Sequence, residues 1–492
     1  MRQGRCSRLG HQTWLDLRLG VITAVVVGLT GCSPLPDDVI VAGQGQTGNG
    51  KQAETGVNVS NVGGKQVITI TYNDGTDVGN KLNYTATTRT VNAGATQLGW
   101  SYSLDAGVSW KYGGSVSPPP GWAVLWGDPA ITSDFADQRY VFISNLAVPT
   151  SKVPPGGNMT GPMNQYMGGA CIARSEDGGI TFKIHQCVTN NSHFYDGSSM
   201  VAAGQPDDHR VFAAFFDVVT GQVDVWASPT DTGVFQRLSN PFPGINMASH
   251  PRLRFDRARN ALYVAAMDPA GQVYINRYIT GWGEPIVATL PSAGGSVSVE
   301  LSDRTLRTAA QFSFDVGLAS EIGDDSVRIA YTVEDEATGK LYIRGAYCDA
   351  ELTHCGDAPE WGTTPGNFAL DGEQFNPQLR AYKRFGDPGV WKLTYMSTDG
   401  DPNGNTVSYK QGEFAVVNGV RFHIPLDLIT RQIVCSDLRG YWGDYDELQV
   451  LGFDEDSNEP IFVFAHADSR KGCHSRWQYT SRELHIAAVV FT

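Results

Sequence analysis

Short runs of apolar and β-branched residues recur along most of this chain. Residues 66–72 (QVITITY) alternate apolar and polar side chains, and similar runs stand at 140–143, 211–216 and 461–465. Clusters of Gly, Asp, Asn and Pro separate the runs, and no helical periodicity lasts longer than a turn or two. Period-two alternation bounded by turn residues is typical of half-buried β-strands. The pattern therefore predicts an all-β chain.

The runs belong to a larger repeat, in which a small or polar lead-in precedes an apolar strand, a polar turn and a second apolar strand. Its copies occupy residues 126–144, 196–216, 249–267, 324–347, 376–396 and 441–465. Each copy and the interval after it can form a four-stranded sheet, and six such sheets around an axis form a propeller with protected edges. We therefore expect a six-bladed β-propeller over residues 64–492. The last run, 483–491, is a candidate to complete the blade begun by residues 66–72.

The first residues have the composition of a targeting segment. Four arginines precede the apolar run 21–29, which is much shorter than the ~20 residues of a membrane span. Leu29-Thr30-Gly31-Cys32 follows and resembles the lipobox of bacterial lipoproteins, whose cysteine carries lipid. This resemblance implies a signal peptide at residues 1–31, lipid attachment at Cys32, export, and an anchor in the cell envelope at the outer membrane. The alternative is an ordinary signal peptide with a chance cysteine.

Residues 32–63 are rich in Gly, Gln, Thr, Asn and Ser, which predicts a flexible tether. Removal of residues 1–31 takes away four Arg and one Asp, which leaves 33 basic and 50 acidic residues and a formal charge of −17. A chain this acidic repels phosphate backbones and anionic headgroups, so we expect no nucleic-acid partner. Membrane contact is expected through the lipid only, and the protein is expected to be a monomer.

Six cysteines remain in the mature chain, and an even number in an exported protein indicates disulfides. Fifteen pairings are possible for six cysteines. Local pairing favours Cys171–Cys187, Cys348–Cys355 and Cys435–Cys473, because each pair closes a loop within one supersecondary unit. A metal site is the weaker interpretation, since no Cys-x-x-Cys pair or histidine cluster accompanies these residues.

Two segments carry a sharper motif, S-x-D-x-G-x-[ST]-[WF]. Its fixed positions are Ser103, Asp105, Gly107 and Trp110 in one copy, and Ser175, Asp177, Gly179 and Phe182 in the other. The segments resemble Asp boxes, the bacterial neuraminidase repeats of the sialidase superfamily, and residues 228–235 resemble a degenerate copy. In such a turn the Asp accepts backbone N–H bonds, the Gly permits a positive φ and the aromatic ring packs between strands. The resemblance implies a sialidase-like propeller with these turns at its periphery.

The same resemblance implies an activity that the sequence matches only in part. Catalytic sialidases combine three arginines that bind the sugar carboxylate, a Tyr nucleophile with a Glu partner, and an Asp acid/base. The first arginine normally stands in a Phe/Tyr-Arg-Ile/Leu-Pro motif ahead of the first Asp box, whereas this chain has only Thr88-Arg89-Thr90 there. We therefore expect recognition of an extracellular glycan or protein through the axial face, with no catalysis evident. The alternatives are a glycoside hydrolase of exo-sialidase type and a non-catalytic envelope scaffold.

Candidate site residues stand at the starts of the repeats, because equivalent starts converge on one face of a propeller. The ligand-binding candidates are Trp126, Asp128, His193, Tyr195, His250, Arg252, Asn376, Arg439 and Trp442. The dense stretch 439–447 also supplies the catalytic candidates Tyr441, Asp444, Tyr445 and Glu447. Aromatic rings there can stack on sugars, and carboxylates can bind hydroxyls. The alternative is that Trp-Gly-Asp, at 126–128 and 442–444, forms a blade-packing turn around a buried Asp.

One turn also resembles a calcium loop. It places oxygen ligands at alternate positions and a Gly at the sixth position, and its candidate ligands are Asp399, Asp401, Asn403 and Asn405. Lys410 stands where a helix-loop-helix calcium site has Glu, so a solvated turn is the alternative. Structural calcium is thus the one candidate cofactor, and no cofactor is required by the expected function.

Overall fold

A computed structural model describes the chain in segments. The described residues are 39–41, 52–74, 82–84, 88–91, 94–155, 158–160, 166, 168–189, 194–205, 207–229, 233–248, 251–289, 296–301, 304–309, 312–317, 327–335, 338–357, 372–382, 390–398, 406–417, 420–423, 426–427, 432–433, 446–453, 460–468 and 485–491. Apart from one short 3-10 turn, η1 (Thr150–Lys152), every regular element in these segments is a β-strand. The all-β prediction is confirmed.

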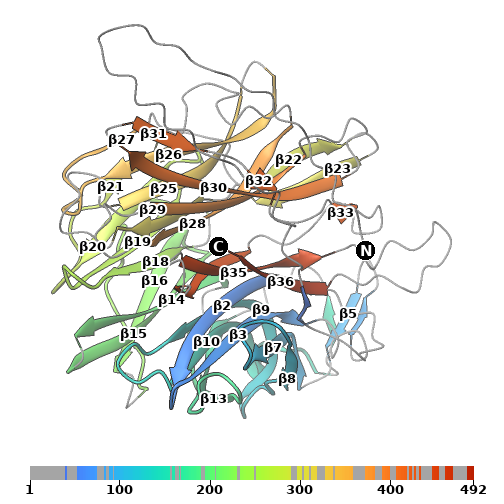
Figure 1. Cartoon of the computed structure of the whole chain (residues 1–492). Coiled ribbons are helices and arrows are strands. Elements are labelled where there is room, and N and C mark those ends of the chain that lie inside the picture. Colours follow the sequence, from blue (N-terminus) through green and yellow to red (C-terminus); the bar gives the residue numbers. More distant parts are fainter. Residues whose placement is uncertain are drawn as a thin grey trace, which may run out of the picture.

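Seven sheets, each with four main antiparallel strands, follow one another along the chain, and we number them blades 1 to 7 (Figure 1). Blade 1 contains β2 (Gln52–Val62), β3 (Lys65–Asp74), β7 (Leu98–Ser103) and β8 (Lys111–Ser115). Blade 2 contains β9 (Trp122–Ser133), β10 (Val141–Pro149), β12 (Gly169–Ser175) and β13 (Lys183–Thr189), with the short β6 (Ala95–Thr96) parallel to β9. Blade 3 contains β14 (Tyr195–Gln205), β15 (Asp208–Asp217), β16 (Gln222–Pro229) and β17 (Gln236–Arg237).

The remaining blades repeat this order. Blade 4 contains β18 (Arg252–Asp256), β19 (Ala261–Met267), β20 (Val273–Tyr278) and β21 (Ile286–Val287). Blade 5 contains β24 (Phe312–Val316), β25 (Val327–Glu334), β26 (Leu341–Cys348) and β27 (Cys355–Asp357). Blade 6 contains β28 (Gln374–Tyr382), β29 (Val390–Ser397), β30 (Thr406–Val417) and β31 (Val420–His423), with β32 (Leu426–Asp427) and β33 (Gln432–Ile433) also paired to β30. Blade 7 contains β34 (Glu447–Phe453), β35 (Pro460–Asp468), β36 (His485–Phe491) and β1 (Val39–Ile40).

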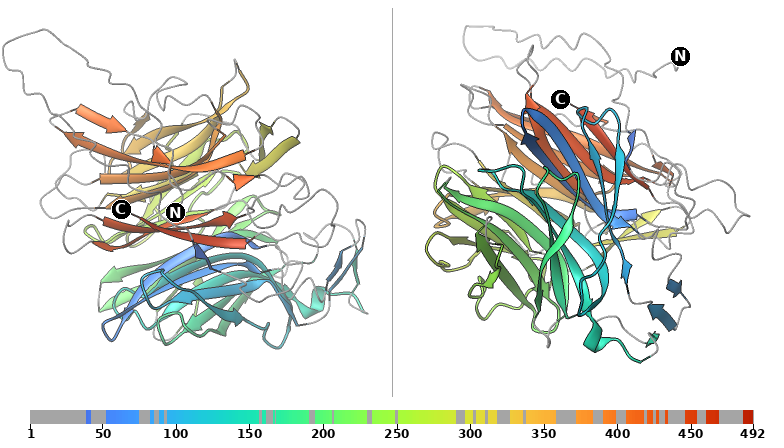
Figure 2. Two further views of the ribbon diagram at one scale, coloured as in Figure 1. Left: turned by 45° about the vertical axis from the view of Figure 1, so that its right-hand side comes forward. Right: turned by 90° about the horizontal axis from the view of Figure 1, so that it is seen from below.

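Two small sheets lie outside the blades. One contains β4 (Leu82–Tyr84), β5 (Thr88–Val91) and β11 (Asn158–Thr160), and the other contains β22 (Ser296–Leu301) and β23 (Arg304–Ala309). Figure 2 shows the dark blue strands of the first sheet at the edge of the molecule, beside blades 1 and 2.

The seven blades form a closed ring. The first strands of neighbouring blades contact one another in the order β2, β9, β14, β18, β24, β28 and β34, and β34 contacts β2. Figures 1 and 2 both show the red β36 beside the blue β2, where the ring closes. The fold is therefore a seven-bladed β-propeller, and the expected number of six blades is wrong. The repeat count missed blade 1, whose first strand reads QAETGVNVSNV and lacks the long apolar run of the other copies.

The ring closes in blade 7 with strands from both ends of the described chain. β1 pairs with β36 in the register Val39↔Ala488, so it forms the outer strand of that blade. The expected pairing of residues 483–491 with residues 66–72 is wrong, because β36 pairs with β35 and β1 while β3 pairs with β2 and β7. The range 32–63, expected as a tether, contains both β1 and β2. The boundary at residue 64 is therefore too late for the propeller.

The segments 103–110 and 175–182 form the same hydrogen-bonded turn, between the third and fourth strands of blades 1 and 2. In the second turn, the carboxylate of Asp177 accepts hydrogen bonds from N of Ile180, N of Thr181 and the Thr181 hydroxyl. Asp105 accepts equivalent bonds from N and the hydroxyl of Ser109. Gly179 has φ of 98°, so this glycine adopts the positive φ that the motif predicts.

Both turns join neighbouring blades. The hydroxyl of Ser60 in blade 1 donates to O of Gly178 at 2.7 Å, and the indole of Trp100 donates to O of Ile180 at 3.2 Å. A side-chain atom at Gly107 would lie 2.7 Å from Val490 of blade 7, so that turn approaches the closing blade without room for a Cβ. These turns therefore stabilise the ring at its periphery.

Two of the expected disulfides are present. Cys171 pairs with Cys187 across β12 and β13, and Cys348 pairs with Cys355 across β26 and β27. The expected pair Cys435–Cys473 lies outside the described residues, as do Cys32 and the segment 1–31. Among the segments that the structure describes, no helix is long and apolar enough to cross a membrane.

Candidate functional site

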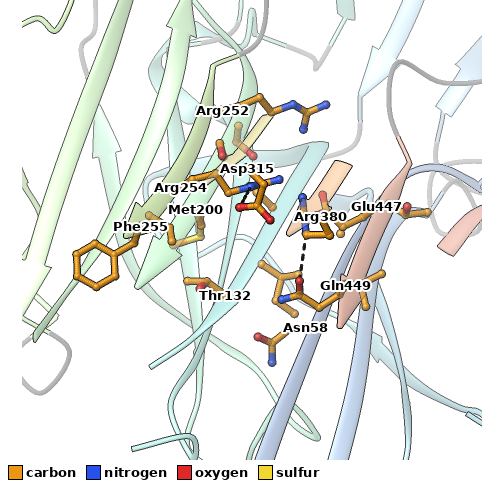
Figure 3. Close-up of a pocket in the computed structure, with 18 of the residues that line it drawn as sticks. Asn58, Thr132, Met200, Arg252, Arg254, Phe255, Asp315, Arg380, Glu447 and Gln449 are labelled. Atoms are coloured by element: carbon orange, nitrogen blue, oxygen red, sulfur yellow. Dashed lines mark hydrogen bonds and ion pairs between the residues drawn. The ribbon is translucent and has the colours of Figure 1, made fainter. Parts of the chain in front are cut away.

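An axial cavity of about 230 Å³ lies where the seven first strands meet (Figure 3). All seven blades contribute to its lining. The residues used below are Asn58 (blade 1), Thr132 (blade 2), Ser199 and Met200 (blade 3), Arg252, Arg254 and Phe255 (blade 4), Asp315 (blade 5), Arg380 (blade 6), and Glu447 and Gln449 (blade 7). A site built from seven strands is fixed by the closed ring rather than by any one loop.

β-Bulges set which residues reach the axis. Glu54, Asp128, Gly197 and Asn376 have φ between 53° and 58°, and each lies at a register shift between the first and second strands of its blade. A bulge adds one residue to one strand and re-aims the side chains that follow. Asn58, Thr132 and Arg380 each stand four residues after one of these bulges, at Glu54, Asp128 and Asn376. All three side chains line the axial cavity. The bulges therefore bring equivalent positions of different blades to the axis.

Blades 4 and 6 present arginines in the same way. N of Leu253 donates to the hydroxyl of Ser199 at 3.0 Å, and N of Leu379 donates to the hydroxyl of Ser313 at 3.0 Å. The next residue in each strand, Arg254 or Arg380, donates from Nη1 to the carbonyl oxygen of that leucine at 2.8 Å. The two arginines thus occupy equivalent positions, and blade 5 lies between them.

Carboxylates from the neighbouring blades accompany these arginines. Nε of Arg254 lies 3.5 Å from Oδ1 of Asp315, whose Oδ2 accepts a hydrogen bond from N of Ala381 at 2.8 Å. Arg380 pairs with Glu447 through Nη2 and donates from Nε to Gln449 at 3.2 Å. Figure 3 shows Arg380 between Asp315 and the blade 7 residues Glu447 and Gln449. Positive and negative side chains therefore alternate around the cavity from blade 4 to blade 7.

The cavity keeps an excess of positive charge and of hydrogen-bond donors. Three arginines and two carboxylates line it, counting Arg252. Burial lowers the pKa of Arg380 well below its usual range, and the charge of Arg254 lowers it further. Burial also lowers the pKa of Arg254, against the charge of Asp315. Nδ2 of Asn58 is buried and donates no hydrogen bond to the described residues, and Nε of Arg254 is buried with only the ion-pair contact to Asp315.

Two predicted site residues line this cavity. Arg252 and Glu447 were expected on the axial face from their places at repeat starts, and both belong to the lining. Arg252 is buried, with 6% of its surface exposed.

Four other predicted residues support the ring instead. Asp128 accepts a hydrogen bond from N of Gly197 at 3.3 Å and donates from its own N to Asn73 at 2.7 Å, which joins blades 1, 2 and 3. Asn376 donates to Asp446 at 2.9 Å between blades 6 and 7. The contacts of Asp128 are those of a blade-packing turn, which was the alternative interpretation of residues 126–128. The other two are Trp126, which packs on the core of blades 2 and 3, and Tyr195, whose buried hydroxyl donates to Asp224 at 2.7 Å.

The remaining candidates lie outside the described residues. They are His193, His250, Arg439, Tyr441, Trp442, Asp444, Tyr445, Asp399, Asp401, Asn403 and Asn405. In the part of the chain that is described, no group of three or more His, Cys, Asp or Glu side chains is arranged to hold a metal.

Sequence reasoning missed most of the lining, including Asn58, Arg254, Asp315, Arg380 and Gln449. One signal was available, since Pro251-Arg-Leu-Arg254 and Pro377-Gln-Leu-Arg380 repeat a Pro-x-Leu-Arg pattern in two copies of the repeat. Asp315 carried no such signal, because the fourth copy of the repeat, 324–347, begins after the first strand of blade 5.

No family model and no curated protein matches this sequence. Solved structures do resemble it. The BP39L lectin of Burkholderia pseudomallei is 13% identical, with 89% of this chain and 96% of the lectin covered and a TM-score of 0.48. The NanB sialidase of Streptococcus pneumoniae is 11% identical (94% and 71% covered, TM-score 0.39). An exo-β-1,3-galactanase of Phanerochaete chrysosporium is 10% identical (93% and 99% covered, TM-score 0.35). At these scores the likeness carries no functional argument, and the propeller is established by the seven sheets of the chain itself.

Proposed function

We propose that this protein recognises a glycan and that its axial cavity holds one sugar unit. The observation that supports this most directly is Nδ2 of Asn58, a buried donor that makes no hydrogen bond with the described residues and lies on the wall of a polar cavity. A buried donor without a partner costs about 1–3 kcal/mol, which an acceptor on a ligand can recover. Sugar hydroxyls are such acceptors.

The size and lining of the cavity favour a small polyhydroxylated ligand. Its volume of about 230 Å³ lies below the ~300–1,000 Å³ that is usual for drug-sized ligands, so a single sugar unit suits it better than an extended chain. Arg, Asp, Glu, Gln and Asn side chains are planar groups that can contact two neighbouring hydroxyls at once. Buried ion pairs contribute little to stability on average, so the charged lining is better explained by binding than by folding.

A glycoside hydrolase of exo-sialidase type is the second candidate, and the three arginines of the lining favour it. Two of them are already engaged, however, since Arg254 faces Asp315 and Arg380 pairs with Glu447. A carboxylate clamp needs guanidinium groups that are available to the ligand. Recognition without hydrolysis is therefore our preferred function. Release of fluorophore from a fluorogenic sialoside by the purified protein would instead support the hydrolase.

We further propose that lipid on Cys32 anchors the propeller in the cell envelope. β1 begins at Val39, so only residues 33–38 separate the anchor from the outer strand of blade 7. Fully extended, this segment spans about 20 Å, at ~3.3–3.6 Å per residue. The anchor would therefore hold blade 7 near the headgroups. Cys32→Ser should abolish metabolic labelling with a palmitate analogue, and persistent labelling would contradict the proposal.

The proposed recognition is tested with a glycan array. The purified wild-type protein should bind a restricted set of glycans, and Arg252→Gln should lose those signals because it removes a donor group from the cavity. Lys183→Gln removes the same charge from the outermost strand of blade 2, where the side chain is 74% exposed, and should keep them. An array without signals for the wild-type protein would count against glycan recognition.

A further inference from the structure

A cluster of four side chains lies where the first strands of blades 2 and 4 end, and one of its members lines the axial cavity. We call Phe135, Phe255, His209 and Arg257 the aromatic cluster. The rings of Phe135 and Phe255 stack with centroids 6.4 Å apart and an interplanar angle of 16°. The guanidinium of Arg257 lies 4.7 Å from the ring centre of Phe135, and the ring of His209 meets Phe135 edge-on at 6.0 Å. Phe255 belongs to the lining of the cavity.

The cluster joins blades 2, 3 and 4. Phe135 follows β9 of blade 2, whereas Phe255 and Arg257 belong to blade 4 and its first turn. Blade 3 stands between them, because β14 contacts both β9 and β18. The contact between blades 2 and 4 therefore spans blade 3, whose His209 also belongs to the cluster.

Polar contacts fix the position of Phe135. The preceding residue, Asp134, is fully buried, and its Oδ1 accepts a hydrogen bond from N of Ala136 at 2.9 Å. Its Oδ2 lies 3.1 Å from Nε2 of His209 on blade 3. N of Asp134 also donates to O of Tyr140 at 2.9 Å, which closes the turn between β9 and β10. The ring is thus held by blades 2, 3 and 4 together.

The two phenylalanines differ from those of the core. Phe142, Phe215 and Phe314 are fully buried, whereas Phe135 and Phe255 are partly buried. Phe135 packs against the core of blades 2 and 3 and Phe255 against the core of blades 3 and 4, and Phe255 also lines the cavity. An aromatic face beside hydrogen-bonding groups is a suitable surface for a pyranose, whose C–H bonds gather on one face of the ring while its hydroxyls point outward. Figure 3 shows Phe255 on the opposite side of Arg254 from Arg380 and Glu447.

From this arrangement we infer that Phe255, supported by Phe135, forms an aromatic subsite for the apolar face of the bound sugar. The inference rests on the proposed glycan recognition, and it specifies which kind of sugar the cavity prefers. The preferred ligand is a pyranose with one face rich in C–H bonds, with its hydroxyls toward Arg254 and Asn58. Phe135 acts only through Phe255, as a positioning residue.

Calorimetric titration of the strongest-binding array glycan tests the subsite. Phe255→Leu keeps an apolar side chain but removes the ring face, so affinity should fall by about three- to tenfold. Phe255→Tyr should stay within about twofold of the wild-type protein, and Phe135→Leu should weaken binding less than Phe255→Leu does. In proton NMR spectra, the C–H protons of one sugar face should shift upfield on binding to the wild-type protein, and this shift should disappear with Phe255→Leu.

The possible outcomes separate the subsite from the proposed function. If Arg254→Gln weakens binding while Phe255→Leu leaves both affinity and proton shifts unchanged, the subsite is wrong and axial recognition stands. If neither variant changes affinity, the glycan binds elsewhere and both proposals fail. If Phe255→Leu unfolds the protein, the subsite is tested by the wild-type protein and Phe255→Tyr instead. Absence of the upfield proton shifts in the wild-type protein would contradict ring stacking, and so would a Phe255→Tyr affinity well outside the twofold range.

Discussion

The peripheral turns of blades 1 and 2 and the axial cavity are built in opposite ways. Each turn is contained in eight consecutive residues, and the hydrogen bonds of its Asp carboxylate join residues at most four apart, as between Asp177 and Thr181. The cavity is assembled from seven strands, and its contacts join residues as far apart as Arg380 and Glu447. The turn could therefore be recognised from a motif, whereas the cavity could not. The clearest motif in this chain reports how the blades are joined, and the candidate site lies elsewhere.

This contrast predicts that changes in the turns alter stability and leave glycan affinity intact. Gly179→Ala should lower the free energy of unfolding in urea by about 3 kcal/mol, the largest effect expected here. A new Cβ would sit 2.2 Å from Oγ1 of the buried Thr69, on a backbone with φ of 98°.

Gly121→Ala is the matched control for that prediction. Gly121 has a similar φ of 90°, but no atom lies within 4 Å of its added Cβ. Its cost should stay near 1 kcal/mol, which is the backbone strain alone. Equal losses for the two variants would show that the turn does not pack against blade 1 as described.

The equivalence of blades 4 and 6 at the axis gives a second prediction. Ser199→Ala and Ser313→Ala each remove the buried hydroxyl that accepts a hydrogen bond from a leucine N–H. Each should lower the free energy of unfolding by about 1–3 kcal/mol, and by similar amounts, because both leave a buried donor without a partner. A loss for only one of them would mean that the arginine positions of the two blades are not equivalent.

The smallest expected effect is a dependence of folding stability on pH, through the carboxylate of Asp105. Hydrogen bonds from the Ser109 hydroxyl and N–H, and from Ser103, lower the pKa of Asp105 from 3.8 to about 2. Because the folded-state pKa is the lower one, these bonds stabilise the protein above pH 3.8 and are lost as the pH falls through about 2. The stability difference between the wild-type protein and Asp105→Asn should therefore shrink from pH 5 to pH 2. A difference that does not depend on pH, measured by urea unfolding at several pH values, would contradict this assignment.

The sequence predicted strands well, because alternation within a run depends only on neighbouring residues. The run 66–72 became the middle of β3, and 211–216 lies within β15. The number of blades was wrong because β2 is rich in polar residues that are buried rather than exposed. Asn58 lies on the wall of the axial cavity, and Ser60 lies against blade 2. A polar strand that is buried by its neighbours cannot be told from a tether by composition.

Site residues were predictable only where their place in the sequence repeat marked them. Arg252 and Glu447 were found because they stand at repeat starts. Asp315 was missed because its role depends on Arg254 of the preceding blade, and a pair between blades leaves no spacing in the sequence. Asp128 was placed at the correct junction, but its bulge directs the carboxylate to Gly197 of the next blade.

The central claim is that the axial cavity binds a sugar unit, and the most direct test is calorimetric titration of the strongest-binding array glycan with Arg254→Gln. Loss of the guanidinium, whose Nε is a buried donor in the cavity, should weaken binding about tenfold or more, while Lys183→Gln binds as the wild-type protein does. Equal affinity of the wild-type protein and a folded Arg254→Gln variant would contradict the claim.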